Sequence, residues 1–201
     1  MISPELIIAF PAIFEPRENK QGVEKYSGMF LIDKSRAEDI ALINAEYERA
    51  KKEGMKKKWN NRLPKFKYIS VKDGDEYLEN YAEDNMGEEP DAAMIKMYTN
   101  RIFFNASCNT KNPPGIVGPD GRLLTDKTAI YSGCIVRIDV RAWPNDFEKN
   151  YGVSWWLNNV MLVRGGERLD GKLDAVEAFA SYAQPTYEND THETVDSSDL
   201  A

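Results

Sequence analysis

The chain has 201 residues, and 26 Lys and Arg against 33 Asp and Glu give it a formal charge of −7 at pH 7. This length predicts one domain, and a hydrophobic fraction of 42% excludes a wholly disordered chain. Two Cys exclude a disulfide framework and a four-cysteine zinc site. The one His, His192, lies in a polar terminal segment, which argues against a catalytic triad or a His-rich metal site. We expect no cofactor and no bound metal.

The apolar runs of the sequence are too short to span a membrane. The longest covers residues 6–14 and is broken by Pro11, whereas a spanning helix needs about 20 residues. The first five residues lack the basic region of a signal peptide. We therefore expect a cytoplasmic protein with reduced thiols.

Periodic patterns predict five main strands and two helices. Residues 6–14 and 26–32 resemble the two strands of a hairpin. A capping box and apolar residues at helical spacing predict a helix over 36–53. The remaining expected elements are three strands and a short helix, at residues 98–108, 133–143, 153–164 and 172–183.

Helices and strands do not alternate along the chain, which argues against a parallel nucleotide-binding sheet. The predicted fold is all-β with inserted helices. It is an OB-fold, a five-stranded antiparallel Greek-key barrel with a helix after the second strand. The expected domain covers residues 1–184, and residues 185–201 form a disordered acidic tail.

The acidic residues are concentrated in two segments. Residues 185–201 hold five acids and residues 73–91 hold nine, and neither segment contains a Lys or Arg. Without these acids the rest of the chain has 26 bases against 19 acids. The negative total therefore conceals a basic remainder, and it does not exclude a nucleic-acid partner.

Ten of the bases lie in residues 49–72, where Glu53 is the only acid. Trp59, Phe66 and Tyr68 are interleaved with them. A solvated helix end and loop would have such a charge run. Cations interleaved with aromatic rings are also what single-stranded nucleic acid requires of its binding surface.

The tryptophans of the later strands offer further stacking surfaces. Alternation places Trp143 on the same outward face as Arg137 and Arg141, where either a structural cation–π cluster or a base-stacking platform would fit. Trp155 and Trp156 point to opposite faces of their strand. At least one of them belongs to the core, and the sequence leaves open which.

The stretch from Asp73 to Glu76 holds three closely spaced carboxylates. Calcium loops have oxygen ligands at such spacing, but the later Gly and Glu of those loops are missing here. A solvated acidic loop is the simpler interpretation, and a two-metal nuclease is the enzymatic alternative. Cys108 and Cys134 fall on apolar strand faces, which is typical of core residues.

Four stretches, taken together, resemble a known family. They are Phe10–Pro16 with Glu24–Ile32, Phe104–Ser107, Ile130–Arg137, and Gly152–Ser154 with Leu157–Arg164 and Gly166–Leu169. In order and spacing the chain resembles the OB-fold single-stranded-DNA-binding proteins of tailed bacteriophages. It is distantly similar to the replication single-strand binder of podophages.

The resemblance implies sequence-tolerant binding of single-stranded DNA during phage replication and recombination, in the cytoplasm of the infected bacterial host. It also implies an acidic C-terminal tail that contacts phage or host replication proteins such as a polymerase or helicase. The podophage relatives end in an aromatic residue, and Leu200 would take that place here.

We predict a non-enzymatic binder, with a protein-interaction or structural barrel as the alternative from another class. The DNA-binding residues expected from charge and alternation are Lys56, Lys57, Lys58, Trp59, Arg62, Lys65, Lys67, Arg101, Phe103, Arg137, Arg141, Trp143 and Trp156. The partner-binding tail residues are Glu188, Asp190, Glu193, Asp196, Asp199 and Leu200. A homodimer is compatible with the sequence, which does not fix the oligomeric state.

Overall fold

The structure is a computed structural model that describes residues 1–19, 21–66, 69–147, 150–169, 171 and 179–182. Lys67, the predicted tail and most of the helix expected at 172–183 lie outside these residues. A short 3-10 helix, η2 (Ala180–Tyr182), is described within that expected helix. No helix in the described part of the chain is both long and apolar enough to cross a bilayer.

The main predicted elements are confirmed. The five long strands are β1 (Leu6–Glu18), β2 (Glu24–Asp33), β4 (Arg101–Asn109), β6 (Ile135–Asn145) and β7 (Gly152–Arg164), and the long helix is α1 (Ala37–Lys57). β1 extends past Pro11 because its ladder with β2 shifts register after Ala9 and again after Ala12. Upstream of these irregularities, at Leu6 and Ile7, β1 also pairs with β6, so it lies between β2 and β6.

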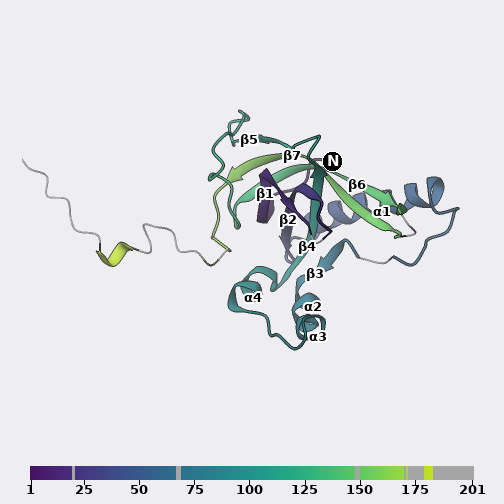
Figure 1. The fold of residues 1–201 in the computed structure, drawn as a ribbon, viewed down its shortest axis with the longest axis horizontal. Coiled ribbons are helices and arrows are strands. Elements are labelled where there is room, and N and C mark those ends of the chain that lie inside the picture. Colours follow the sequence, from purple (N-terminus) through teal and green to yellow (C-terminus); the bar gives the residue numbers. More distant parts are fainter. Residues whose placement is uncertain (20, 67–68, 148–149, 170, 172–178, 183–201) are drawn as a thin grey trace, which may run out of the picture.

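Five short elements were not among the elements that we predicted. They are β3 (Val71–Asp73), α2 (Gly74–Glu79), α3 (Tyr81–Asp84), α4 (Ala92–Tyr98) and β5 (Gly115–Val117). Figure 1 shows α2, α3 and α4 grouped beside β3. Part of the acidic block is structural: Asp73 accepts hydrogen bonds from the N–H groups at the start of α2, and Asp91 does the same for α4.

The strands form one mixed sheet in the order β3-β4-β2-β1-β6-β7-β5. β4 pairs with β2 in antiparallel fashion and also with β7 in parallel fashion, so β1, β2, β4, β6 and β7 form a closed circuit. The fold is therefore OB-like, but our prediction of five purely antiparallel strands is wrong. Alternation along the sequence reveals a strand but not whether it pairs in parallel or antiparallel fashion. β3 and β5 have only three residues each, too few for alternation to be recognised.

The core has two parts. The larger lies inside the circuit of strands and includes Phe30, Phe104 and Trp155, whose ring centroid is 4.7 Å from that of Phe104. A second cluster combines Leu31 of β2 and Phe103 of β4 with residues of α2 and α4. Both faces of β4 are thus partly buried, which a simple inside–outside alternation does not predict.

Helix α1 covers the open edge of β6. The N–H of Ala142 donates to the Glu46 carboxylate at 3.0 Å, and Arg49 donates to the Ala142 carbonyl at 2.7 Å. Trp59, just beyond α1, donates from Nε1 to the carbonyl of Asn145 at 3.2 Å. These contacts satisfy backbone groups of β6 beyond the short stretch where it pairs with β1, and they fix the C-terminal end of α1 beside the β6–β7 hairpin.

The tyrosine-serine-glycine-cysteine stretch before β6 forms a clamp between distant parts of the chain. The hydroxyl of Ser132 accepts a hydrogen bond from the N–H of Phe10, and its carbonyl accepts one from Leu169. Gly133 donates to the carbonyl of Ile8 at 2.8 Å and has a φ of 117°, in the region that favours glycine. Ile130–Arg137, one of the stretches that carry the resemblance, therefore has a structural role.

Candidate nucleic-acid interface

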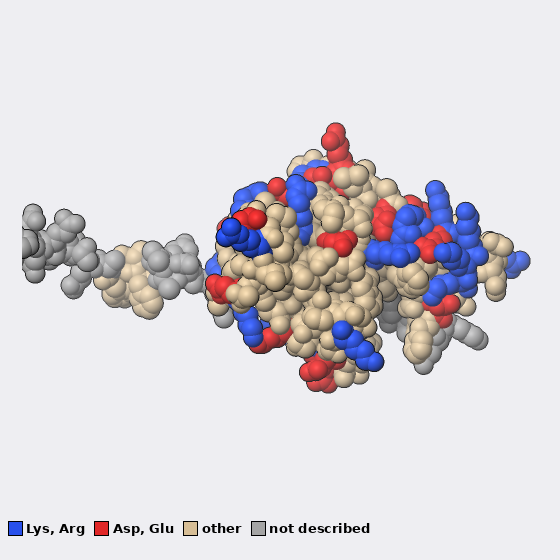
Figure 2. All heavy atoms as spheres, turned by 90° about the horizontal axis from the view of Figure 1, so that it is seen from above, with Lys and Arg blue, Asp and Glu red and all other residues tan. Residues whose placement is uncertain are grey.

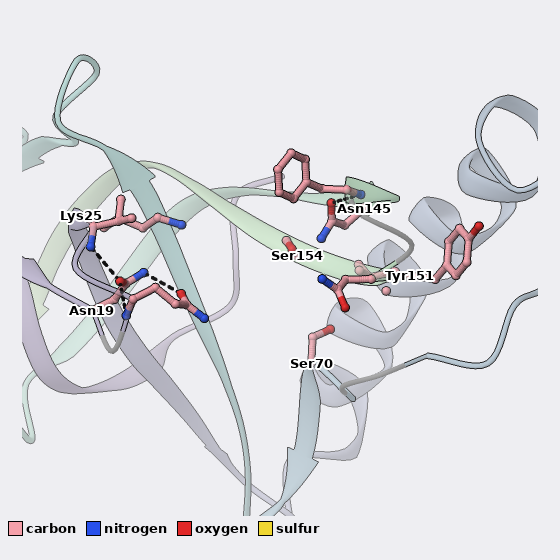
Figure 3. Close-up of a pocket in the computed structure, with 12 residues that line it drawn as sticks. Asn19, Lys25, Ser70, Asn145, Tyr151 and Ser154 are labelled. Atoms are coloured by element: carbon pink, nitrogen blue, oxygen red, sulfur yellow. Dashed lines mark hydrogen bonds between the residues drawn. The ribbon is translucent and has the colours of Figure 1, made fainter.

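A groove runs between the turn of the β1–β2 hairpin and the turn of the β6–β7 hairpin. It consists of two adjoining cavities of about 580 and 440 Å³. Both cavities are lined by Lys25, Asn145 and Ser154, so they form one continuous surface, which we call the groove. Figure 3 shows Asn19 and Lys25 on one wall of the larger cavity and Asn145, Ser154, Tyr151 and Ser70 on the other.

The smaller cavity forms the aromatic end of the groove. Trp143 of β6 and Trp156 of β7 line it, and they are 42% and 40% exposed. Trp156 is paired in register with Arg141 on one side and with Ser107 of β4 on the other. Trp155 is only 3% exposed, so the structure assigns it to the core and leaves Trp156 as the exposed ring of the pair.

Two cations lie against the Trp143 ring. The Arg141 guanidinium carbon is 5.1 Å from the ring centroid, and the Lys58 Nζ is 5.3 Å from it. The cation–π cluster is therefore present, and it joins α1 to β6. Because Trp143 remains two-fifths exposed, the same cluster presents aromatic surface and positive charge together.

Acidic residues hold these cations in place. Lys58 forms an ion pair with Asp146 at 2.9 Å, and Arg141 lies 3.7 Å from Glu53. Hydrogen bonds from Lys57 and Arg49 lower the pKa of Glu53 to about 2, so its carboxylate is charged at any physiological pH. Glu53 thus offsets part of the positive charge at the end of α1.

The basic run predicted from the sequence surrounds this end of the molecule. Figure 2 shows Lys and Arg crowded at the end of the molecule where α1 terminates in Figure 1. Lys56, Arg62 and Lys65 are exposed there, and Lys57 is exposed while paired to Glu53 at 2.9 Å. The predicted residues that the structure brings closest to the groove are Lys58, Arg141, Trp143 and Trp156.

Trp59 and Phe103 are buried, so our prediction that they stack bases is wrong. Trp59 is 4% exposed, and it packs against Gly54 and Phe66. Phe103 is 3% exposed, and its ring centroid lies 4.9 Å from that of Tyr98. The outward face of β4 that alternation assigns to Phe103 is covered by α2 and α4.

Arg101 and Arg137 are held by other contacts and do not line the groove. Arg101 pairs with Asp33 at 2.8 Å and donates to main-chain carbonyls at the end of α4, at the far end of β4 from the groove. Arg137 lies 3.6 Å from Glu5 and donates to the carbonyl of Ser3. The structure therefore does not join these two arginines to the other predicted residues.

Sequence reasoning missed the polar half of the groove. Lys25 belongs to β2, and most of the other polar groups come from the two hairpin turns. The sequence pattern of those segments predicts turns but does not indicate a binding surface. The polar side chains lining the larger cavity are Asn19, Gln21, Lys25, Ser70, Asn145, Asn150, Tyr151 and Ser154. Phe147, at the β6–β7 turn, adds an exposed ring beside them.

Two of the three carboxylates considered for metal binding, Asp73 and Asp75, are engaged in structural contacts. Lys34 lies 2.6 Å from both Asp73 and Asp75, and its hydrogen bonds lower the pKa of both carboxyls. Within the described ranges, no group of three or more His, Cys, Asp and Glu is placed to hold a metal ion.

Comparisons with known proteins bear on the fold and the family of the chain. The solved structure of the single-stranded DNA-binding protein of bacteriophage Enc34, in complex with single-stranded DNA, superimposes with a TM-score of 0.60 at 18% identity, over 83% of this chain and 87% of that one. The gp2.5 single-stranded DNA-binding protein of bacteriophage T7 superimposes with a TM-score of 0.51 at 13% identity, over 87% and 96%. No curated protein sequence matches the chain.

At these identities the superpositions establish the fold. The family is established by the sequence itself, because the family model described as "Enterobacter phage Enc34, ssDNA-binding protein" matches residues 2–192. The chain therefore belongs to the Enc34 single-stranded DNA-binding protein family.

Proposed function

We propose that this protein is a non-enzymatic binder of single-stranded DNA that acts on phage DNA in the infected bacterial cell. The observation that carries the proposal is the groove, where two exposed tryptophans lie beside Lys58 and Arg141. In OB-folds the loops that flank this groove bind oligonucleotides. The Enc34 relative solved with single-stranded DNA supports the same assignment.

In the proposed mechanism, bases stack on Trp143 and Trp156 while cations at the end of α1 and on β6 neutralise the phosphates. The cations would be Lys56, Lys57, Lys58, Arg62, Lys65, Lys67 and Arg141. Neutralising phosphates releases counterions, so this electrostatic part of the affinity depends on salt and not on base identity. Arg101 and Arg137, which other groups hold away from the groove, have no part in this mechanism.

A salt titration of binding to oligo-dT tests the electrostatic part. The logarithm of the binding constant should fall linearly with the logarithm of salt concentration, with a slope of about −0.7 per phosphate contacted. Arg141→Ala should make the slope shallower by about 0.7, because one contact is lost. Arg137→Ala is the matched control on the same strand, and it should leave the slope unchanged. A slope near zero in the unmodified protein would contradict the proposed function.

We propose a second role for the acidic tail, residues 185–201, which lie outside the described structure. Its five carboxylates would compete with DNA for the cations at high effective concentration, and bound DNA would free the tail to recruit a polymerase or helicase. Through this recruitment the protein would act in replication and recombination.

Removing residues 185–201 tests the competition. The truncated protein should bind oligo-dT more tightly than the full chain, most clearly at low salt, where the tail's charge is least screened. The ratio of the two affinities should approach one as salt rises. Equal affinities at low ionic strength would refute the competition and leave only recruitment.

The same binding reactions separate the other functional classes. A protein-interaction barrel would bind neither duplex nor single-stranded competitor, and a metal-dependent nuclease would shorten the DNA when magnesium is added. Our proposal predicts competition by single strands above duplex and intact DNA after incubation with magnesium.

A further inference from the structure

The β1–β2 turn fixes the orientation of two amide side chains in the larger cavity. The Asn19 Oδ1 accepts hydrogen bonds from the main-chain N–H groups of Gln21 at 2.9 Å and Val23 at 3.0 Å. Only an oxygen can accept both, so the nitrogen of this amide has to lie on the other side. That nitrogen donates to the Gln21 Oε1 at 3.2 Å. The Gln21 oxygen is thereby engaged, and its Nε2 hydrogens are left to act as donors.

On the opposite wall, the amide of Asn145 is also oriented by a hydrogen bond to its oxygen. The Asn145 Oδ1 accepts a hydrogen bond from the N–H of Phe147 at 3.2 Å, which leaves the Asn145 Nδ2 as a donor. Figure 3 shows this amide across the cavity from Lys25, whose ammonium group can only donate. Among the described residues, neither the Gln21 Nε2 nor the Asn145 Nδ2 donates to a protein acceptor.

The cavity therefore presents fixed donors on two facing walls. The hydroxyls of Ser70, Tyr151 and Ser154 and the amide of Asn150 also line it. A hydroxyl rotates to donate or accept, and no hydrogen bond between described residues fixes the Asn150 amide, so these groups do not discriminate between ligands. A group held between the walls is favoured when it carries an acceptor at each end. A donor at either end would face another donor and lose a hydrogen bond.

We infer that this end of the groove holds the hydrogen-bonding edge of one DNA base and favours thymine over cytosine. Thymine carries a carbonyl oxygen at each end of that edge, whereas cytosine carries an amino group at one end. The two pyrimidines have the same size, so the difference lies in the hydrogen bonds. This inference rests on the proposed function. It adds a base preference to a groove that otherwise binds DNA through the charge of the phosphates and the stacking of the bases.

The test compares oligo-dT with oligo-dC of about 16 nucleotides, the upper end of the site sizes of one OB-fold. Binding of the full chain is followed by tryptophan fluorescence. The unmodified protein should bind oligo-dT about three- to tenfold more tightly, the factor expected for one hydrogen bond gained or lost. A ratio within twofold of one would overturn the inference. Failure to bind either strand would instead refute the proposed function.

Two isosteric substitutions connect the preference to the cavity. Gln21→Glu and Asn145→Asp each replace a donor nitrogen by an acceptor oxygen and keep the oxygen that already accepts a hydrogen bond. Each should weaken both complexes through its added charge and should also bring the ratio of the two affinities toward one. Trp143→Ala, at the aromatic end, should weaken both complexes and leave the ratio unchanged. A ratio that persists in both amide variants would overturn the inference.

Discussion

Replacement of Trp143 by alanine is expected to weaken binding to oligo-dT about 5- to 150-fold, since a base stacked on an aromatic ring is worth about 1–3 kcal/mol. The midpoint of thermal unfolding should change little, because the ring lies at the surface of β6 and fills no part of the core. Fluorescence titration and thermal denaturation of the same preparation give both quantities. If the midpoint falls in step with the affinity, the cation–π cluster with Lys58 and Arg141 is structural instead.

The adjacent tryptophans of β7 provide the control. Trp156→Ala should resemble Trp143→Ala, with weaker binding and an unchanged midpoint, because its ring is also exposed at the aromatic end. Trp155→Ala should do the opposite and cost about 3–5 kcal/mol of stability, since it empties a core site beside Phe104. If Trp156→Ala lowers the affinity and Trp155→Ala lowers the stability, the stacking role of one ring is distinguished from the packing role of its neighbour.

The second large effect is expected at Gly133. A Cβ there would overlap the carbonyl oxygen of Glu167, and the φ of 117° is itself unfavourable for alanine. The Glu167 oxygen is a main-chain atom and a Cβ at Gly133 is fixed by the backbone, so no side-chain rotation relieves the overlap. Gly133→Ala should therefore cost about 4 kcal/mol or more of the free energy of unfolding, measured by urea denaturation.

Gly121 is the matched control for this substitution. It also has a positive φ, of 76°, but a Cβ there would meet nothing within 4 Å. Gly121→Ala should therefore show only the backbone cost, about 1–2 kcal/mol. Equal losses of stability in the two variants would mean that the contact between the clamp and the segment after β7 can relax.

The sequence predicted those elements whose own residues reveal them. β6 alternates through Val136, Ile138 and Val140, and α1 repeats apolar residues at helical spacing, so both were visible without a structure. β3 and β5 are too short for a pattern, and the acidic residues around α2 and α4 look like a solvated loop. α2 and α4 nevertheless form, and the carboxylates of Asp73 and Asp91 cap their N-termini.

The same distinction applies to the groove. Trp143 and Arg141 could be predicted because alternation along one strand places them together, and the structure confirms that the two lie in contact. Phe103 could not be judged in this way, because its burial depends on helices that the sequence did not reveal. Nor could Lys25 be paired with Asn145, since the two hairpins that bring them together are more than a hundred positions apart.

The strand pairing also determines when the groove first exists during synthesis. β1 pairs with β6 from Ile7 to Ile135, and the circuit closes only when Ala106 meets Trp155. At about 5–20 residues per second, the ribosome needs on the order of 10 s after making β1 before its second partner emerges. The basic run at the end of α1 is exposed throughout that interval, while the aromatic end of the groove is still missing. A nascent chain therefore carries the charge for nucleic acid but not the stacking surface, and the groove assembles only after β7 has left the ribosome.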